Sequence, residues 1–245
     1  APAAGRYWFL LAEVRLASGD RLAAEQAYAT VAYDRHDPQF GADAGYNHWL
    51  LATAADAAEQ GARATRFNAS YANDERLLPM LAESARALLA AADMLPAAAL
   101  AQQLLASPQV LPPALAAVAH QVLARSYFAQ QQFAFAESEF RQLLAIAPAD
   151  RDAAEADVRQ WLATSIYQQG LQARDNQQTD EAIDHLLRVA QVAPQTKIHR
   201  TAHYEAALLA VDAKRWQQAE PLLLAYQRGW PADDLLTDVD AMLVS

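Results

Sequence analysis

The stretch from Ala116 to Pro148 most constrains the fold of this chain, because its residue types recur, in altered form, at least three more times along the sequence. Apolar and small residues recur at helical spacing in both halves of the stretch, which predicts two short amphipathic helices. The residues expected on their packing faces are His120, Leu123, Ala124 and Tyr127, then Ala136, Phe140, Leu143 and Leu144. Helix pairs that repeat in this way pack on their neighbours, so the sequence predicts an all-α solenoid.

A small residue near the start of each second helix sets the length of the repeat. The alanines expected in this position are Ala24, Ala98, Ala136, Ala182 and Ala219. Their gaps are 74, 38, 46 and 37 residues, and the first gap equals two repeats of 37. The spacing therefore predicts a degenerate unit around Tyr46 to Tyr71. In the 46-residue gap it predicts either a longer helix near Ala153 to Asp175 or a longer loop at Pro148 to Asp152.

This pattern resembles the tetratricopeptide repeat, whose first helix carries a bulky residue, leucine, a small residue and tyrosine, and whose second carries alanine and a closing proline. The resemblance implies a right-handed α-solenoid, or superhelix, of about six helical hairpins in a single domain over residues 1–245. The expected units are 4–37, 38–73, 74–110, 111–149, 150–195 and 196–231, with a partial unit or a capping helix at 232–245. Terminal repeats normally need a polar cap, so the abrupt ends favour a piece of a longer protein.

Composition removes several function classes. The formal net charge of −10 argues against a surface that binds nucleic acid through its phosphates. The absence of cysteine excludes disulfides, thiolate metal sites and a cysteine nucleophile. No apolar stretch reaches the ~18 residues of a membrane span, so no direct span is expected. The expected partner is a protein or peptide, and the oligomeric state stays open.

Catalytic signatures are lacking, since the sequence has no glycine-rich phosphate loop and no motif of a metalloprotease or serine hydrolase. The strongest metal candidate is the pair His199 and His203, four residues apart, with Glu205 nearby. A metal would need further ligands, and His203 occupies a core position of its repeat. We therefore expect no catalytic residue, metal or cofactor. A second polar cluster, expected only to start a helix, contains Asp180, Glu181, Asp184 and His185.

In tetratricopeptide proteins, ligands lie along those first-helix residues that remain once the core positions are assigned. Carried onto this chain, the resemblance implies a concave groove lined by Arg6, Phe9, Gln121, Arg125, Phe128, Tyr167, Arg174 and Tyr204. Aromatic side chains mixed with arginine suit a partner polypeptide that carries apolar and acidic groups. If the register shifts by one residue, several of these side chains pack between helices instead.

The expected function is a non-catalytic adaptor that holds a polypeptide in its concave groove. One alternative is a structural spacer that associates with itself, and another is a metal-dependent enzyme that uses His199 and His203. The alanine-rich, arginine-over-lysine composition is similar to that of bacterial envelope members of the family, which serve assembly or export. That similarity implies the periplasm or cell envelope, with the cytoplasm as the alternative.

Overall fold

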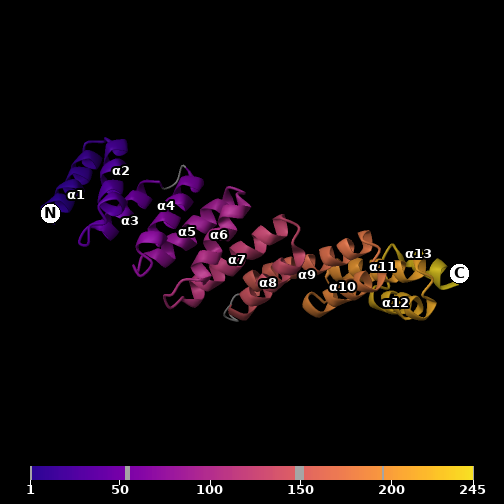
Figure 1. The fold of residues 1–245 in the computed structure, drawn as a ribbon. Helices are drawn as coiled ribbons and strands as arrows, with labels where there is room; N and C mark the ends of the chain where they lie inside the picture. The colour runs from indigo at the N-terminus through magenta and orange to yellow at the C-terminus, as the bar shows by residue number, and fades with distance from the viewer. Residues whose placement is uncertain (1, 53–55, 147–151, 195, 245) are drawn as a thin grey trace. The chain divides into compact units, whose positions relative to one another are not determined.

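The computed structural model describes residues 2–52, 56–146, 152–194 and 196–244, and every regular element in these ranges is helical. Figure 1 follows the chain from α1 in indigo to α13 in yellow. The elements are α1 (Pro2–Ala17), α2 (Arg21–Ala29), the π-helical turn η1 (Thr30–Asp34), α3 (Gly41–Leu51), α4 (Ala57–Ser70), α5 (Leu77–Ala90), α6 (Met94–Leu105), α7 (Pro113–Ala129), α8 (Phe133–Ile146), α9 (Asp152–Asp175), α10 (Thr179–Val192), α11 (Lys197–Asp212), α12 (Trp216–Gly229) and α13 (Leu236–Val244). The predicted all-α class is confirmed for the described ranges.

The chain forms two compact units, which we call the N-terminal body (Ala1–Gln130) and the C-terminal body (Gln131–Ser245). Within each body, helices that follow one another in sequence pack together as a stacked array of hairpins. The division falls between α7 and α8, inside the range 111–149 that the sequence suggests as one repeat. Each body is therefore described by itself below.

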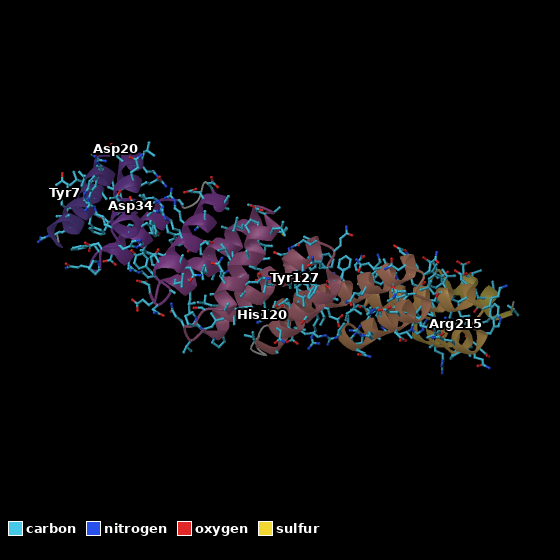
Figure 2. All side chains as sticks on the ribbon, in the orientation of Figure 1. Tyr7, Asp20, Asp34, His120, Tyr127 and Arg215 are labelled. Atoms are coloured by element: carbon cyan, nitrogen blue, oxygen red, sulfur yellow. The ribbon has the colours of Figure 1, made fainter. Side chains whose placement is uncertain are left out.

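Four first helices end in the same hydrogen-bonded turn. At the end of α1, the N–H of Asp20 (labelled in Figure 2) donates to the carbonyl of Arg15 at 2.9 Å, and that of Gly19 donates to Leu16 at 3.0 Å. This pair of bonds is a Schellman motif, and α5, α9 and α11 end with the same pair. The residues with positive φ in these turns are Gly19, Ala92, Gln177 and Lys214, at +86°, +59°, +63° and +57°. A shared turn thus folds each of these second helices back on its first.

The turn fixes the register of the small residue that repeats in the second helices. Ala24, Ala136, Ala182 and Ala219 each donate their N–H to the carbonyl four residues earlier, at the start of the helix. In α6 this bond is made by Ala97, at 3.2 Å from Asp93, so the prediction of Ala98 was wrong by one residue. Ala97 is fully buried, whereas Ala98 is 7% exposed. Because both residues are alanine, the sequence alone does not distinguish them, and the turn geometry decides which one takes the repeated position.

The degenerate repeat predicted around Tyr46 to Tyr71 corresponds to the helices α3 and α4. Here Gln60 makes the repeated bond, to the carbonyl of Asp56 at 3.0 Å, and Gly61 follows it. A β-carbon on Gly61 would lie 2.8 Å from Cδ1 of Leu88 on α5, so the absence of a side chain lets the helices approach. In this repeat a buried glutamine, Gln60, takes the position of the repeated alanine, and the close approach to α5 is made at the next residue, Gly61.

The wide gap between Ala136 and Ala182 comes from α9, which has 24 residues where α7 has 17. The predicted longer helix is therefore confirmed. The alternative, a longer loop at 148–152, lies almost entirely outside the described residues, as does Pro148 itself. Near the end of α9, a β-carbon on Gly170 would lie 2.8 Å from Cγ of Leu186, which shows how closely α9 and α10 pack.

Candidate binding surface

The first helices of successive hairpins lie side by side in each body and form what we call the first-helix face. In the N-terminal body, Asn47 on α3 donates to Glu13 on α1 at 3.3 Å. Arg76, just before α5, pairs with Asp43 on α3 at 2.8 Å, and α5 in turn contacts α7. In the C-terminal body, α9 contacts α11. The predicted binding residues lie on four of these helices, α1, α7, α9 and α11.

A groove of about 420 Å³ opens between α3 and α5 on this face of the N-terminal body. Its lining consists of Tyr46, Trp49, Leu50, Glu75, Arg76, Pro79, Met80 and Glu83. Trp49 and Met80 are buried and form the floor. The indole Nε1 of Trp49 donates to the hydroxyl of buried Ser84 at 3.0 Å, which satisfies the one polar atom of the ring. The floor therefore offers an apolar surface.

Arg76 is held rigidly at the rim of this groove. Its guanidinium donates twice to Asp74 and once to Asp43, each at 2.8 Å, and lies 5.0 Å from the centre of the Tyr46 ring. The pKa of Asp74 lies below its ordinary value because the hydrogen bonds from Arg76 outweigh the effect of burial. The same hydrogen bonds raise the pKa of Arg76. The positive charge of Arg76 is thus already balanced by two carboxylates.

In the C-terminal body, the three predicted residues Tyr167, Arg174 and Tyr204 lie on α9 and α11. Arg174 pairs with Glu205 at 3.4 Å and with Asp175 at 3.1 Å. Burial raises the pKa of half-buried Tyr167, and the charge of Glu205 raises it further. Tyr204 is also half-buried, and its ring lies 5.7 Å from that of Tyr226 in the core. Tyr167 and Arg174 therefore face a shared surface, while Tyr204 is partly a packing residue.

The residues predicted on α1 have two different environments. Arg6 is exposed. Phe9 is half-buried, with its ring 5.7 Å from that of Tyr28 on α2 and 5.4 Å from that of Phe40 before α3. Phe9 thus helps to hold α1 against its neighbours, which is the packing role that the alternative register anticipates.

The residues predicted on α7 are separated from those on α1 by the intervening hairpins. Gln121 is exposed, and Arg125 and Phe128 are half-buried. Helix α7 packs in a cluster with α5 and α6, whereas Phe9 packs in a different cluster with α2. The structure therefore does not gather these five predicted residues into one site, and the α3–α5 groove lies between them.

Sequence reasoning missed the groove, although a signal for it was present. Tyr46 lies 37 residues after Phe9, and Glu83 lies 37 residues after Tyr46, so the repeat length carries the predicted position on α1 into the groove. Tyr46 and Glu83 were missed because the repeat formed by α3 and α4 lacks the alanine that marks the start of the second helix in the other repeats.

The two histidines of the metal hypothesis pack around a tryptophan. His203 lies 2.9 Å from the carbonyl of Leu222 through its Nε2, which must therefore carry a proton and cannot bind a metal in this tautomer. The rings of His199 and His203 lie 5.0 and 5.5 Å from that of Trp230. Burial and the neighbouring His203 lower the pKa of His199. Within the described ranges, no three His, Cys, Asp or Glu side chains converge as metal ligands.

The acidic cluster at the start of α10 makes structural ion pairs. Asp180 pairs with Arg215, before α12 (labelled in Figure 2). His185 lies 2.8 Å from Arg188 and 3.8 Å from Glu181. The cluster thus links α10 to the next hairpin.

No helix in the described part of the chain is both long enough and apolar enough to cross a bilayer.

Comparison with known proteins gives weak structural similarity only. No family model matches the sequence, and no curated protein matches it. A tetratricopeptide repeat protein from Parabacteroides merdae is 10% identical with a TM-score of 0.41, over 99% of this chain and 100% of that one. The structure of Pseudomonas aeruginosa pilF is 15% identical with a TM-score of 0.39, over 98% and 97%. The TPR2AB domain of yeast Sti1, in its pHSP90 complex, is 11% identical with a TM-score of 0.34, over 100% and 98%.

Proposed function

We propose that this chain is a non-catalytic scaffold of the tetratricopeptide type, and that it binds a polypeptide along its first-helix face. The observation that carries the proposal is the groove between α3 and α5, which joins a buried apolar floor to charged rim residues on that face. Because the groove is built from packed helices, binding would cost the scaffold little ordering entropy.

The second part of the proposed surface is the patch on α9 and α11. Tyr167 and Arg174 supply an aromatic ring and a guanidinium, the two side-chain types enriched at binding hot spots. Arg6, Gln121, Arg125 and Phe128 extend the proposed surface along the first helices of the N-terminal body. Phe9 and Tyr204 would contribute mainly through the part of each ring that the core leaves exposed.

The test is affinity capture from an extract of the source cells, followed by mass spectrometry. The double variant Tyr167→Ala/Arg174→Ala should retain at least about fivefold less of the captured partner, since a hot-spot truncation costs more than ~1 kcal/mol. Leu224→Ala is the matched control, because Leu224 is 38% exposed on the second helix α12. Equal retention by the double variant and the wild type would contradict this part of the surface.

A self-associating spacer is the second candidate function, and one observation favours it. Tyr7, Leu10 and Val14 are 62%, 51% and 65% exposed and share one face of α1 at helical spacing. Such a stripe can bury itself against another apolar surface. Light scattering over a range of concentrations tests this, and a mass that rises in the wild type but not in Tyr7→Ser/Leu10→Ser would favour the spacer.

We also propose a bacterial cell-envelope location, supported by composition alone: the chain has no cysteine and few lysines. Fractionation of the source cells into periplasm and cytoplasm tests this. Recovery of the protein with cytoplasmic markers would replace the envelope by the cytoplasmic alternative.

A further inference from the structure

We propose that the α3–α5 groove accepts a polypeptide segment in which one large apolar side chain is flanked by lysine or arginine. This inference rests on the proposed function and names the chemistry of its partner. It differs from the sequence-based expectation of an acidic partner.

The apolar part of the proposal follows from the floor. Trp49 and Met80 are 2% and 1% exposed, and Leu50 on the wall is 39% exposed. The indole N–H of Trp49 donates to Ser84, so it is not available as a donor to a polar ligand group. A volume of about 420 Å³ lies in the range of pockets that hold small ligands, and it accommodates one aromatic or long aliphatic side chain with adjoining backbone.

The basic part follows from the charges at the rim. Glu75 and Glu83 line the groove and are exposed. Arg76 is the one cation among the lining residues, and it is paired with Asp43 and Asp74 at 2.8 Å. The rim is therefore net negative, and an acidic segment would meet repulsion whereas lysine or arginine would find two carboxylates.

The experiment must separate this local charge from the negative charge of the whole chain. The C-terminal body has 17 acidic and 10 basic residues, so it attracts basic peptides without any groove. The groove variant is Glu75→Lys/Glu83→Lys. Its matched control is Asp157→Lys/Asp184→Lys, which makes the same charge change at exposed positions on α9 and α10.

Random dodecapeptides displayed on phage are selected against the whole chain, and the enriched peptides are synthesised with a fluorescent label. We expect a consensus with a central aromatic or aliphatic residue and neighbouring lysine or arginine. By fluorescence polarisation, the groove variant should bind these peptides at least about tenfold more weakly, while the control changes less than about twofold. Circular dichroism melts of both variants should match the wild type, which shows that each is folded.

The remaining outcomes overturn the inference in distinguishable ways. Enriched peptides with acidic flanks, or basic peptides that lose equal affinity for both double variants, contradict the groove chemistry. Peptides that bind the groove variant as tightly as the wild type but bind Tyr167→Ala more weakly contradict binding in the groove. That outcome leaves the proposed scaffold function intact. A selection that enriches no peptide contradicts both.

Discussion

The two bodies bury charges of opposite sign. In the N-terminal body Arg63 is 8% exposed and donates to the carbonyl of His48 at 2.6 Å, to Glu59 at 2.7 Å and to Glu25 at 3.1 Å. In the C-terminal body Glu137 is 7% exposed. It accepts hydrogen bonds from Gln169 at 2.6 Å, from Arg141 at 2.8 Å and from Arg188.

Both buried charged side chains link three helices. Arg63 on α4 ties together α2, α3 and its own helix, and Glu137 on α8 ties together α9, α10 and its own helix. Small residues and turns thus repeat along this chain, whereas the polar links across hairpins differ from one hairpin to the next. The two bodies should therefore respond differently to substitution and to pH.

The largest expected effect is from Arg63→Ala. The substitution leaves the buried His48 carbonyl without its donor and removes one of the two cations paired with Glu25, Arg21 being the other. Breaking a buried ion pair costs about 3–5 kcal/mol. Native-state hydrogen exchange should show this loss in peptides from residues 1–130 and none in peptides from 131–245. Arg66→Ala is the control, since Arg66 is exposed above the Tyr33 ring. A loss of equal size in both bodies would contradict the prediction that Arg63 stabilises the N-terminal body.

Acid should weaken the N-terminal body first. Burial, together with the charges of Arg63 and Arg66, lowers the pKa of His48 from 6.5 to about 4, and Glu59 opposes this shift. Because of this lowered pKa, His48 takes up its proton at a higher pH in the unfolded chain than in the folded one as the solution is acidified. Stability is therefore intact above pH 6.5 and falls toward pH 4, by about 2–3 kcal/mol.

The C-terminal body should hold until a lower pH. Burial alone would raise the pKa of Glu137, but hydrogen bonds from Arg141 and Gln169 and the charge of Arg188 lower it below 4.5, so its contribution is lost only below that pH. His199 also has a lowered pKa, but it is half-buried and contributes less. Hydrogen exchange at pH 5 and pH 7 measures the difference between the bodies. His48→Gln should remove most of it, and an unchanged difference would exclude His48 as its source.

Glu137→Ala should destabilise the C-terminal body by about 2–3 kcal/mol. The effect is smaller than that of Arg63→Ala because the side chains of Arg141 and Arg188 are 48% and 34% exposed and can turn toward water. Hydrogen exchange in peptides from residues 131–245 checks this, with Glu139→Ala as the neighbouring control. A cost above that of Arg63→Ala would reverse the comparison.

The smallest effects concern the shared turns. Gly19→Ala should cost about 1 kcal/mol in the N-terminal body, because its φ of +86° strains a side chain although a β-carbon would meet no atom within 4 Å. Lys214→Gly, at a φ of +57°, should stabilise the C-terminal body by up to about 1 kcal/mol. Urea denaturation of both variants measures the signs, and equal signs would contradict the turn assignment.

The sequence could predict what repeats and not what is local. The helix period and the small residues correctly indicate paired helices, and Ala24, Ala136, Ala182 and Ala219 take the predicted position. The prediction of Ala98 was off by one residue because several alanines follow one another there. Turn geometry alone shows that Ala97 is the repeated residue.

The same reason explains the misses in the candidate site. On α9, Gln169 donates to buried Glu137, a partner 32 residues earlier. The charge balance of the α3–α5 groove depends on Asp43, Asp74 and Arg76, which the fold brings together from two hairpins. Such long-range polar pairings leave no periodic trace in the sequence.

Photo-crosslinking in the source cells tests most directly whether a polypeptide binds on the first-helix face. The photoreactive residue p-benzoylphenylalanine is placed singly at Leu50 in the groove, at Tyr167 on α9, and at Thr65, which is exposed on the second helix α4. We predict polypeptide adducts from Leu50 and Tyr167 and little from Thr65. Adducts of equal yield from Thr65, or adducts from Thr65 alone, would contradict it.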